Sequence, residues 1–419
     1  MLMPAFSSWV ERDGLCYRAG RLTFAGRDVA AFAAAFDEPV FLHDGDRALA
    51  NLGRIGAALA GRGLRHRVYF AMKANRFRPL LSHMRAGGVF GLDVCSAEEL
   101  REALACGFAP ERISFTAHGL TAAAAALLAA FPAIVANLDT ISAIRRLGRL
   151  APGREIGLRL NPGVGVAYRD SELLAYSGAS VSKFGIYPEH LDAAIACARD
   201  HGLTVTALHC HAGCGVLTPQ LDAYARVLAA VAAGLDRLPD VRLVNLGGGL
   251  GVPHRDDDAA LDLARWADLI AATFARRDVE IAVEPGDYAV KDAGFLVLRV
   301  NYVEEKRGVR FVGLDGGFNL AIEPAFYGLA CVPLPCLPRP GPLRPTTLAG
   351  NINEALDIWA RDVALPPIEE GDRVALVNTG GYSASMSSNH CMNGRFREFL
   401  FAGAAPSSYA PTSQAGRQQ

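Results

Sequence analysis

The stretch Tyr69-Phe70-Ala71-Met72-Lys73-Ala74-Asn75 is a short apolar run that ends in a lysine. It has the character of a buried strand with Lys73 at its end. An ammonium group in such a place must find an anionic partner, lose its charge or form a covalent bond, because burying an unpaired cation is costly. Lys73 could also simply point to solvent, so the rest of the chain has to decide between these interpretations.

Seven more apolar stretches of strand length follow the first one. They alternate with Ala-, Leu- and Arg-rich stretches of helical periodicity, such as 96–106 and 218–235. We expect the second of these helices to begin with Thr218 as its N-cap and Pro219 in the first helical position. Apolar strands that alternate with helices indicate a parallel sheet covered on both faces, and eight such units predict a closed (β/α)8 barrel, the TIM barrel. The predicted strands are 68–72, 91–95, 113–116, 134–138, 156–161, 205–211, 243–246 and 281–284.

The pattern changes after about residue 290. Short β-like runs over 294–303, 309–314 and 373–378, with Pro-rich turns between 333 and 345, predict a second, mostly β domain. The fold class is therefore α/β, a barrel followed by a C-terminal β domain. We expect residues 1–35 to join the β domain, 36–290 to form the barrel, 291–403 to form the β domain, and 404–419, rich in Ser, Pro, Gln and Gly, to be a disordered tail.

Composition excludes several classes of protein. The 419 residues are 51% hydrophobic and 20% charged, which is typical of a globular protein with a large core. A net charge of −1 gives no indication of a nucleic-acid or membrane partner. The nine cysteines form no C-x-x-C pair, and the cluster from His209 to Cys214 has no second ligand pair, so we predict no metal site and a cytoplasmic protein with reduced thiols. We expect no signal peptide and no membrane-spanning segment.

Most predicted strands end in a polar side chain or in glycines. The active sites of (β/α)8 barrels lie at the carboxyl ends of their strands. A purely structural explanation of the barrel predicts no such bias, so these residues are expected to share one site. They are Lys73, Asp93, Asn137, Asn161-Pro162-Gly163, His209 and His211, Gly247-Gly248-Gly249, and Glu284-Pro285-Gly286.

Pyridoxal 5'-phosphate is a cofactor that such a set suits, because it is held as a Schiff base on a desolvated lysine. Backbone N–H groups of Gly247-Gly248-Gly249-Leu250-Gly251 could surround its phosphate, and Glu284 could keep its ring nitrogen protonated. His211 could stack on the ring, and Tyr382 could donate to the phosphate. Each feature has an ordinary alternative: a glycine turn, a Glu-Pro-Gly turn, a satisfied histidine or a buried tyrosine.

Taken together, the motifs resemble those of the fold-type III pyridoxal phosphate enzymes, the alanine-racemase-like barrels, and above all the diaminopimelate and ornithine decarboxylase group. The resemblance extends from about Phe41 to Leu400, and the motifs occur in the order of the family. They are Ala71-Met72-Lys73-Ala74-Asn75, Gly91-Leu92-Asp93-Val94-Cys95-Ser96, Ser182-Lys183-Phe184-Gly185, His209-Cys210-His211-Ala212-Gly213, Gly247-Gly248-Gly249, Glu284-Pro285-Gly286, Asp315-Gly316-Gly317 and the stretch from Tyr382 to Asn389.

The resemblance implies a role for each matching residue. Lys73 would carry the cofactor until the substrate amine displaces it, after which the α-carboxylate is lost and the carbon is protonated. The expected cofactor-binding residues are Lys73, Asp93, His211, Gly248, Gly249, Glu284, Gly286 and Tyr382. The expected catalytic residues are Lys73, His211, Asn353 and Glu354, and the expected substrate-binding residues are Asp287, Glu323, Tyr327, Glu354 and Tyr382. The resemblance also implies a head-to-tail homodimer with shared active sites.

Two departures from the family concern the substrate. Diaminopimelate decarboxylases carry Arg directly after Glu-Pro-Gly, where this chain has Asp287, and a second Arg where it has Glu323. In the family these arginines receive the distal carboxylate of the substrate, which matches their bidentate geometry. Two acids there would repel a distal carboxylate and favour an amine or a guanidinium. Alternatively, Asp287 and Glu323 pair with Arg or Lys elsewhere and never face the substrate; Lys291, for example, is four residues after Asp287.

A third departure concerns proton transfer. The family motif Cys-Glu-Ser-x-Asp here reads Asn353-Glu354-Ala355-Leu356-Asp357. In the family the Cys comes from the neighbouring subunit and assists protonation of the carbanion, whereas an amide is a poor proton donor. Glu354, which recognises the distal amine in the family, is retained. Cys214 stands where a Ser near the phosphate is usual.

The sequence therefore predicts a decarboxylase for an amino acid with a cationic or otherwise non-carboxylate distal end, such as a lysine- or ornithine-like compound or a biosynthetic derivative. One alternative is the decarboxylation of meso-diaminopimelate to lysine, with the carboxylate bound by Arg76, Arg169 or another arginine. A second is a racemase or epimerase, which the loss of the Cys keeps open. The small pyridoxal phosphate carrier proteins lack the β domain, and a catalytically dead relative would not be expected to keep the cofactor residues.

Overall fold

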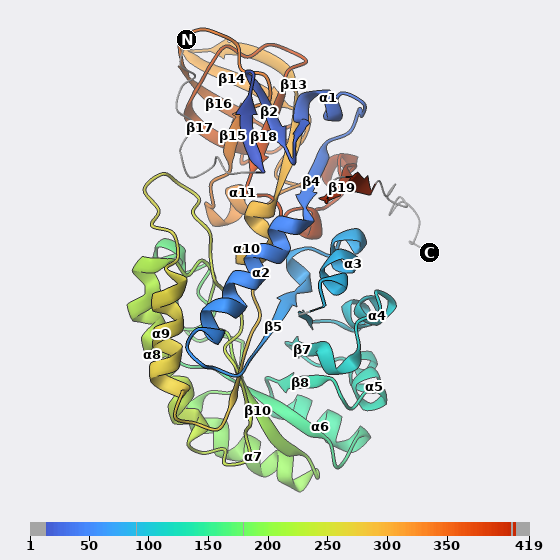
Figure 1. The fold of residues 1–419 in the computed structure, drawn as a ribbon, viewed down its shortest axis with the longest axis vertical. Helices are drawn as coiled ribbons and strands as arrows, with labels where there is room; N and C mark the ends of the chain where they lie inside the picture. The colour runs from blue at the N-terminus through green and yellow to red at the C-terminus, as the bar shows by residue number, and fades with distance from the viewer. Residues whose placement is uncertain (1–13, 89, 179, 404, 408–419) are drawn as a thin grey trace. The chain divides into compact units, whose positions relative to one another are not determined.

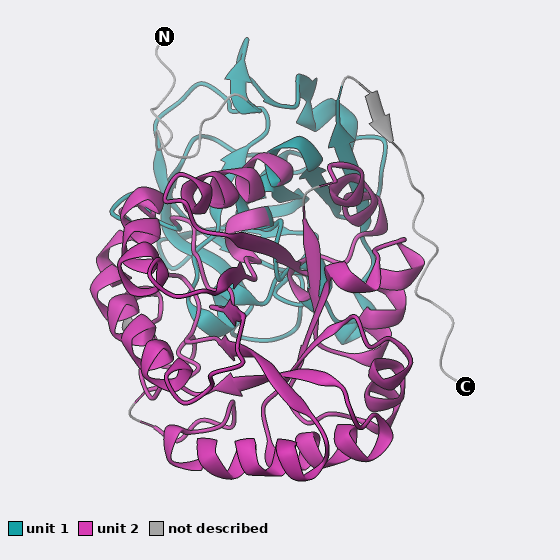
Figure 2. Cartoon of the chain, turned by 60° about the horizontal axis from the view of Figure 1, so that its bottom comes forward, with its two compact units in different colours: residues 1–48, 254–258, 290–419 teal, residues 49–253, 259–289 magenta. Residues whose placement is uncertain are grey.

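The structure is a computed structural model that describes residues 14–88, 90–178, 180–403 and 405–407. The chain divides into two compact units (Figure 2). The barrel unit comprises residues 49–253 and 259–289. The β unit comprises the described parts of residues 1–48, 254–258 and 290–419.

Eight parallel strands form a closed barrel in the barrel unit (Figure 1). They follow one another in chain order, and the last strand pairs with the first to close the barrel. All eight strands predicted from the sequence are present, and the predicted fold class is confirmed. The strands are β5 (His66–Ala71), β6 (Gly91–Val94), β7 (Ile113–Ala117), β8 (Val135–Leu138), β9 (Glu155–Leu160), β10 (Thr204–Cys210), β11 (Leu243–Asn245) and β12 (Glu280–Val283).

Helices connect the strands, and hydroxyl or carboxylate side chains begin several of them. Ser96 Oγ, for example, accepts the N–H of Glu99 at 3.0 Å, which satisfies one of the N–H groups that a helix start leaves free. The helices are α2 (Gly45–Ala60), α3 (Arg78–Ala86), α4 (Ala97–Ala105), α5 (Ala122–Ala130), α6 (Ile141–Leu150), α7 (Leu191–Asp200), α8 (Leu221–Leu235) and α9 (Leu263–Phe274).

The predicted cap of α8 is wrong. A 3-10 turn, Thr218–Gln220, precedes the helix. The hydroxyl of Thr218 donates to the carbonyl oxygen of Ala260 and accepts the N–H of Asp262 at 2.8 Å. Thr218 therefore ties the start of α8 to the loop before α9, because these distant backbone groups bind its hydroxyl where local N–H groups were expected to.

The β unit is built on a mixed nine-stranded sheet and a three-stranded sheet. The strand order of the larger sheet is β17-β16-β14-β13-β4-β19-β20, and β18 pairs with both β13 and β15. Its strands are β4 (Val40–Asp44), β13 (Gly294–Lys306), β14 (Val309–Leu314), β15 (Val332–Pro335), β16 (Arg344–Ala349), β17 (Ile358–Leu365), β18 (Arg373–Val377), β19 (Arg397–Ala402) and β20 (Ala405–Ser407). The small sheet contains β1 (Leu15–Arg18), β2 (Arg21–Phe24) and β3 (Arg27–Asp28), and the short helices of this region are α1 (Val29–Ala33), α10 (Asp287–Val290) and α11 (Glu323–Tyr327).

The three β runs predicted after residue 290 correspond to β13, β14 and β18. The Pro-rich stretch is not only turns, since Pro333 and Pro335 lie in β15 and Pro345 lies in β16. Strand β15 pairs with β18 alone, and an edge strand tolerates proline because one of its sides needs no N–H donor.

The ends of the two units differ from the residue numbers that the sequence indicated. Strand β4 lies between β13 and β19, so residues 40–44 belong to the β unit although the barrel was expected from residue 36. Within the expected tail, Ala405–Ser407 forms β20 against β19, whereas residues 404 and 408–419 lie outside the described residues. The division of the chain into domains stays a prediction.

Candidate active site

The buried carboxylate of Glu284 lies directly after β12 and contacts side chains from three other strands. Its Oε1 accepts hydrogen bonds from Asn245 Nδ2 at 2.6 Å and from Ser114 Oγ at 3.0 Å. Its Oε2 lies 3.1 Å from His209 Nε2. A carboxylate offers about four acceptor positions, so Oε2 keeps one position that these three side chains do not use.

The neighbours of Glu284 determine its charge. Burial by itself raises the pKa of the Glu284 carboxyl, but His209, Lys73 and the hydrogen bond from Asn245 together lower it to about 2. Burial and the charge of Glu284 raise the pKa of Asp93 well above its usual value, against the opposing effect of Lys73. Glu284 is therefore the ionised carboxylate of this group, and Asp93 takes up a proton more readily.

Lys73 lies in a 3-10 turn, Met72–Ala74, directly after β5. Its side chain is exposed to solvent, while the surrounding barrel atoms still desolvate the ammonium group. Desolvation lowers the pKa of Lys73, but Asp93, Cys95 and Glu284 have the larger combined effect and raise it above its ordinary value. Lys73 thus reaches solvent and at the same time lies near the ionised carboxylate of Glu284.

The glycine loop after β11 approaches other backbone segments closely. Gly247 and Gly249 have φ angles of 68° and 94°, a region that favours glycine. A Cβ atom on Gly248 would overlap the carbonyl oxygen of Glu284, and one on Gly249 would overlap that of Gly213. Within the described parts of the chain, the N–H groups of Gly248 and Gly249 donate to no other group. Two N–H groups with no side chain in front of them suit an anion such as a phosphate.

The ring of His211, just past β10, packs edge-on against Tyr176 at 4.8 Å between centroids. Desolvation and the nearby charges of Lys73 and Arg159 hold the pKa of His211 well below its usual value, so the ring is neutral near pH 7. Tyr176 in turn contacts Phe184 of the predicted Ser182-Lys183-Phe184-Gly185 motif at 5.1 Å.

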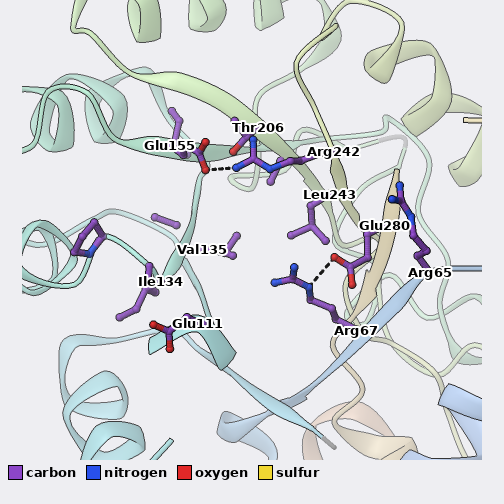
Figure 3. A pocket seen from close by; sticks show the side chains of 15 residues that line it. Arg65, Arg67, Glu111, Ile134, Val135, Glu155, Thr206, Arg242, Leu243 and Glu280 are labelled. Atoms are coloured by element: carbon purple, nitrogen blue, oxygen red, sulfur yellow. Dashed lines mark hydrogen bonds and ion pairs between the residues drawn. The ribbon is translucent and has the colours of Figure 1, made fainter. Parts of the chain in front are cut away.

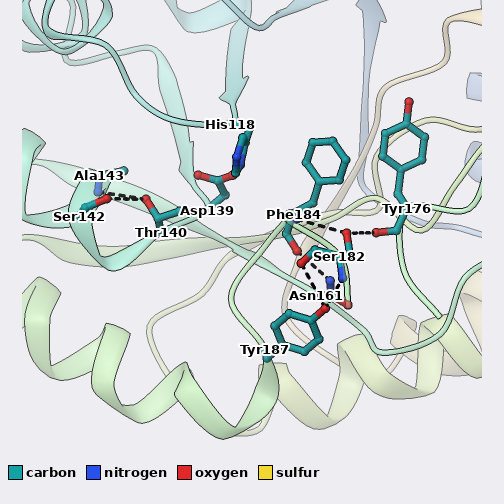
Figure 4. A network of polar contacts seen from close by, with 10 residues as sticks. All are labelled: His118, Asp139, Thr140, Ser142, Ala143, Asn161, Tyr176, Ser182, Phe184 and Tyr187. Carbon is teal, nitrogen blue, oxygen red and sulfur yellow. Dashed lines mark hydrogen bonds and ion pairs between the residues drawn. The ribbon is translucent and has the colours of Figure 1, made fainter. Parts of the chain in front are cut away.

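Side-chain and backbone hydrogen bonds hold that motif in place (Figure 4). Asn161 Nδ2 donates to the carbonyl oxygen of Phe184 at 2.7 Å, and Ser182 Oγ donates to that of Tyr176 at 2.6 Å. On the other side of Phe184, His118 Nδ1 lies 2.7 Å from the buried Asp139 Oδ2. The loop after β9 is therefore fixed to the same end of the barrel as His211.

The predicted strand-end residues Lys73, Asp93, His211, Gly248, Gly249 and Glu284 thus lie together in the barrel unit. Sequence reasoning noted His209 only as a polar strand end and did not single out Ser114 or Asn245, which bind Glu284. The sequence contained a weak indication of their role, since each of the three is a polar residue in an otherwise apolar strand. Gly286 and Asp287 directly follow this site in the chain, and Asp287 begins α10.

Comparison with known proteins decides the family. A family model described as the pyridoxal binding domain of pyridoxal-dependent decarboxylases matches residues 51–291. The chain belongs to this decarboxylase family. The diaminopimelate decarboxylase of Methanothermobacter thermautotrophicus is 32% identical over 393 residues, which cover 91% of this chain and 90% of the relative. That of Escherichia coli K12 is 31% identical over 357 residues, which cover 80% and 83%.

Solved structures show the same architecture. The diaminopimelate decarboxylase of M. jannaschii, in co-complex with L-lysine, has a TM-score of 0.85 and 25% identity, and the match covers 94% of each chain. The arginine decarboxylase of a Paramecium bursaria Chlorella virus, at 17% identity and a TM-score of 0.78, shares the fold over 89% of this chain and 98% of that one. This protein is therefore a pyridoxal phosphate-dependent amino-acid decarboxylase.

The residues of the barrel unit fit pyridoxal phosphate. Lys73 supplies an amine that solvent reaches, and Glu284 supplies an ionised carboxylate with an unused acceptor position on Oε2. The loop of Gly248 and Gly249 supplies two N–H donors. An amine, an anion and a phosphate-sized donor pair are the three kinds of group that this cofactor needs.

One of the two acidic departures in the decarboxylase, Glu323, pairs with a lysine. Glu323 begins α11, and its two carboxylate oxygens lie 2.7 and 2.8 Å from Lys291 Nζ. Lys291 Nζ also lies 5.8 Å from the centre of the Tyr382 ring. Glu323 is therefore paired with a basic residue, as the alternative interpretation allowed, although its partner Lys291 was noted from the sequence only as a neighbour of Asp287. Tyr327 is half-buried at the other end of α11.

Asn353 and Glu354 of the decarboxylase lie on an exposed turn of the β unit. Glu354 Oε1 lies 3.4 Å from His390 Nε2. The turn is closed by Asp357, whose carboxylate accepts the N–H of Ile352 at 2.7 Å. His390 was not singled out from the sequence, because nothing in its local pattern connects it with residue 354.

The side chains in Figure 3, among them Arg67, Glu155, Arg242 and Glu280, line a cavity of about 600 Å³. They lie at the amino-terminal ends of the barrel strands, whereas Lys73 and Glu284 follow the carboxyl ends of β5 and β12. Two ion pairs lie in the cavity lining, Arg67 with Glu280 and Arg242 with Glu155. This end of a (β/α)8 barrel serves stability and not catalysis, so we do not assign it to the decarboxylase site. Among the described residues, no helix is both long enough and apolar enough to cross a bilayer.

Proposed function

We propose that the decarboxylase acts on an amino acid whose distal end is cationic or otherwise not a carboxylate, such as a lysine- or ornithine-like compound or a biosynthetic derivative. The observation that carries this proposal is the buried pair of Lys291 and Glu323. Where the family places a guanidinium for the distal carboxylate, this chain has a carboxylate already bound to an ammonium group.

The electrostatics of this region disfavour a second carboxylate on the substrate. The Lys291–Glu323 pair carries no net charge, so position 323 lacks the positive charge that the family offers to a distal carboxylate. Lys291 cannot turn to a ligand carboxylate without giving up its contacts of 2.7 and 2.8 Å with the buried carboxylate of Glu323, which is costly. A distal amine is compatible with this arrangement, and Glu354 is retained to recognise it.

The barrel residues would hold the cofactor in the manner that the resemblance implies. Lys73 would hold it through Nζ, Glu284 Oε2 would accept its ring N–H, and the glycine loop with Tyr382 would face its phosphate. The neutral imidazole of His211 would cover the ring. The chemistry that pyridoxal phosphate supplies when bound is an electron sink for the pair left by the departing carboxylate.

A substrate screen scored by CO2 release tests the proposal. We expect faster release from L-lysine, L-ornithine or a derivative with a distal cation than from meso-diaminopimelate. Much faster release from meso-diaminopimelate would overturn the substrate class. Lys73→Ala should abolish both turnover and the absorbance band of the cofactor bound to the protein, and a variant that keeps this band would show that the lysine is misassigned.

The second candidate is meso-diaminopimelate decarboxylation, which the names and 31–32% identities of the relatives favour. Expression of the chain in a lysine auxotroph that lacks its own diaminopimelate decarboxylase separates the two functions. Growth without lysine would support the second candidate. We expect no growth from the natural chain and ask whether Lys291→Ala combined with Glu323→Arg, which restores the arginine of the family, permits it.

We also infer a homodimer with shared active sites and a cytoplasmic location. The first rests on the family resemblance. The second is supported by the nine cysteines, all within the described residues, of which none forms a disulfide. Light scattering on the purified holoenzyme tests the dimer, and a monomer at micromolar concentration would contradict it.

A further inference from the structure

We propose that His390, oriented by Glu354, donates the proton to the substrate carbon that loses CO2, in place of the thiol that this chain lacks at position 353. The inference rests on the proposed position of Asn353 and Glu354 at an active site shared between subunits. It assigns a catalytic role to a residue outside the motifs that identify the family.

The starting observation is the contact between the two side chains. His390 Nε2 lies 3.4 Å from Glu354 Oε1, and the two side chains are 44% and 47% exposed. Both can therefore meet a substrate and solvent. The ring of His390 also lies against that of Phe318, with 6.0 Å between centroids. Asn353, the residue in the position of the family thiol, directly precedes Glu354 and is itself exposed.

Buried polar side chains hold the backbone segments that carry Glu354 and His390. The carboxylate of Asp357 accepts the N–H groups of Phe318 and Ile352, both at 2.7 Å, which joins the segment before α11 to the turn of Glu354. A Cβ atom on Gly317 or on Gly350 would overlap this carboxylate. These two hydrogen bonds of Asp357 therefore require glycine at both positions.

A second set of hydrogen bonds joins the segment before α11 to the turn that carries His390. The side-chain amide of Asn319, which is buried, donates to the carbonyl oxygens of Ser388 at 3.2 Å and Asn393 at 3.0 Å. The N–H of Ser388 donates back to the carbonyl oxygen of Asn319 at 2.9 Å. Exposed ion pairs on mobile side chains usually contribute little, but here three segments distant in the sequence are bound together, so the positions of His390 and Glu354 are set by the fold.

The chemistry of the pair suits proton transfer to carbon. With both ring nitrogens protonated, Nε2–H donates to Glu354 and Nδ1–H remains for the substrate. The Nδ1–H bond breaks, and its proton forms a C–H bond with the electron pair that departing CO2 left on the carbon. The neutral, half-exposed imidazole then regains a proton from solvent. The amide of Asn353 cannot perform this step, so the reaction needs a donor from another position.

The neighbouring Cys391 is the rival donor, because its thiol is also exposed. The test compares His390→Gln with Cys391→Ser in the holoenzyme. The measured quantity is the fraction of turnovers that release an aldehyde in place of the amine, which is the product expected when the carbon that lost CO2 is not the one protonated. General acids contribute 10²–10⁴-fold to rate, so His390→Gln should raise this fraction by about tenfold or more, and Cys391→Ser should leave it unchanged.

Rescue distinguishes a catalytic role from a structural one. Adding Asn353→Cys to His390→Gln restores the thiol of the family and should return the product to the amine. In the cofactor-free protein, Glu354→Gln should shift the NMR resonances of the His390 ring, which reports the contact without turnover. A product ratio that His390→Gln leaves as in the unmodified enzyme, or that Cys391→Ser changes instead, would overturn the proposal.

This test of His390 remains valid even if the proposed substrate class is wrong. The product ratio is measured with whichever amino acid releases CO2, including meso-diaminopimelate. Mixing Lys73→Ala protein with His390→Gln protein then asks where the proton comes from. One site of each mixed dimer would contain both natural residues, so the low aldehyde fraction should return. If it does not return in mixed dimers that release CO2, His390 does not act across the subunit boundary.

Discussion

Lys291 Nζ lies 2.7 Å from Glu323 Oε2 in the β unit, and none of the lysine side chain is exposed. A site that binds a carboxylate needs a cation that can pair with it. Here the charge of Lys291 is already neutralised by Glu323. The pair explains why an acid at position 323 is tolerated in a buried place. A lone buried carboxylate would shift its pKa or destabilise the fold.

The first prediction concerns the stability of this pair. Glu323→Gln removes the carboxylate that lies 2.7 Å from a buried ammonium, so we expect the free energy of unfolding to fall by about 3–5 kcal/mol. Lys291→Met combined with Glu323→Leu should recover most of that loss, because apolar residues of similar size need no desolvation of charge. Denaturant unfolding of the single and double variants measures both effects.

The matched control is Glu304→Gln. Glu304 also binds a lysine, Lys306 at 3.0 Å, but these side chains are 56% and 59% exposed. Exposed pairs contribute little to stability, so Glu304→Gln should change the free energy of unfolding far less than Glu323→Gln does. If Glu323→Gln and Glu304→Gln cost the same, the Lys291–Glu323 pair is not desolvated in the way the structure indicates.

The second prediction is a pH dependence from Glu284. Its pKa is lowered in the folded protein to about 2 from 4.5, so the folded state binds the proton less readily than the unfolded state. The stabilisation from this carboxylate is thus present above about pH 4.5 and is lost as the pH falls toward 2. Urea unfolding of the cofactor-free protein should show a steeper loss of stability between pH 5 and pH 3 than Glu284→Gln shows. Equal slopes would argue against the depressed pKa.

The third prediction concerns the glycine loop. Gly249→Ala should prevent folding or cofactor retention, because the added methyl group would overlap the carbonyl oxygen of Gly213. Gly153→Ala is the control, since Gly153 also has a positive φ, 84°, but nothing lies within 4 Å of its Cβ position. It should cost only the backbone strain of about 1–2 kcal/mol. Cofactor absorbance and thermal unfolding report both variants, and similar behaviour of the two would contradict the close approach.

The fourth prediction concerns Asn245, which joins Glu284 to the glycine loop. Its amide donates to Glu284 at 2.6 Å and its oxygen accepts the N–H of Gly247 at 2.9 Å. Asn245→Ala leaves both groups buried with one partner fewer, so we expect a loss of about 1–3 kcal/mol in unfolding free energy and weaker cofactor retention.

The control for Asn245 is an exposed asparagine. Asn351 donates one hydrogen bond, to the carbonyl oxygen of Asp315 at 2.7 Å. Water can replace that bond, so Asn351→Ala should leave cofactor retention unchanged and shift stability by less than about 1 kcal/mol. A change in cofactor retention with Asn351→Ala alone would remove the special role assigned to Asn245.

The sequence by itself determined the barrel and the identity of its polar ends. Each strand is a largely apolar run, so its existence depends on nearby residues, and its carboxyl end follows from chain direction. Lys73, Asp93, His211 and Glu284 could therefore be named, and their place in one unit follows from the closure of the barrel. Local pattern was less reliable for a helix start, because the hydroxyl of Thr218 binds backbone groups 42 and 44 residues away.

Only the tertiary structure decided which polar groups meet. Glu284 contacts side chains 39, 75 and 170 positions away, and Lys291 contacts Glu323 across 32 positions. The charge that a residue presents depends on such partners, because burial and neighbouring charges shift free energies by several kcal/mol in either direction. The sequence showed an acid at position 323 and a missing thiol at position 353. The fold showed that Lys291 neutralises the acid and that His390 lies beside the residue next to the missing thiol.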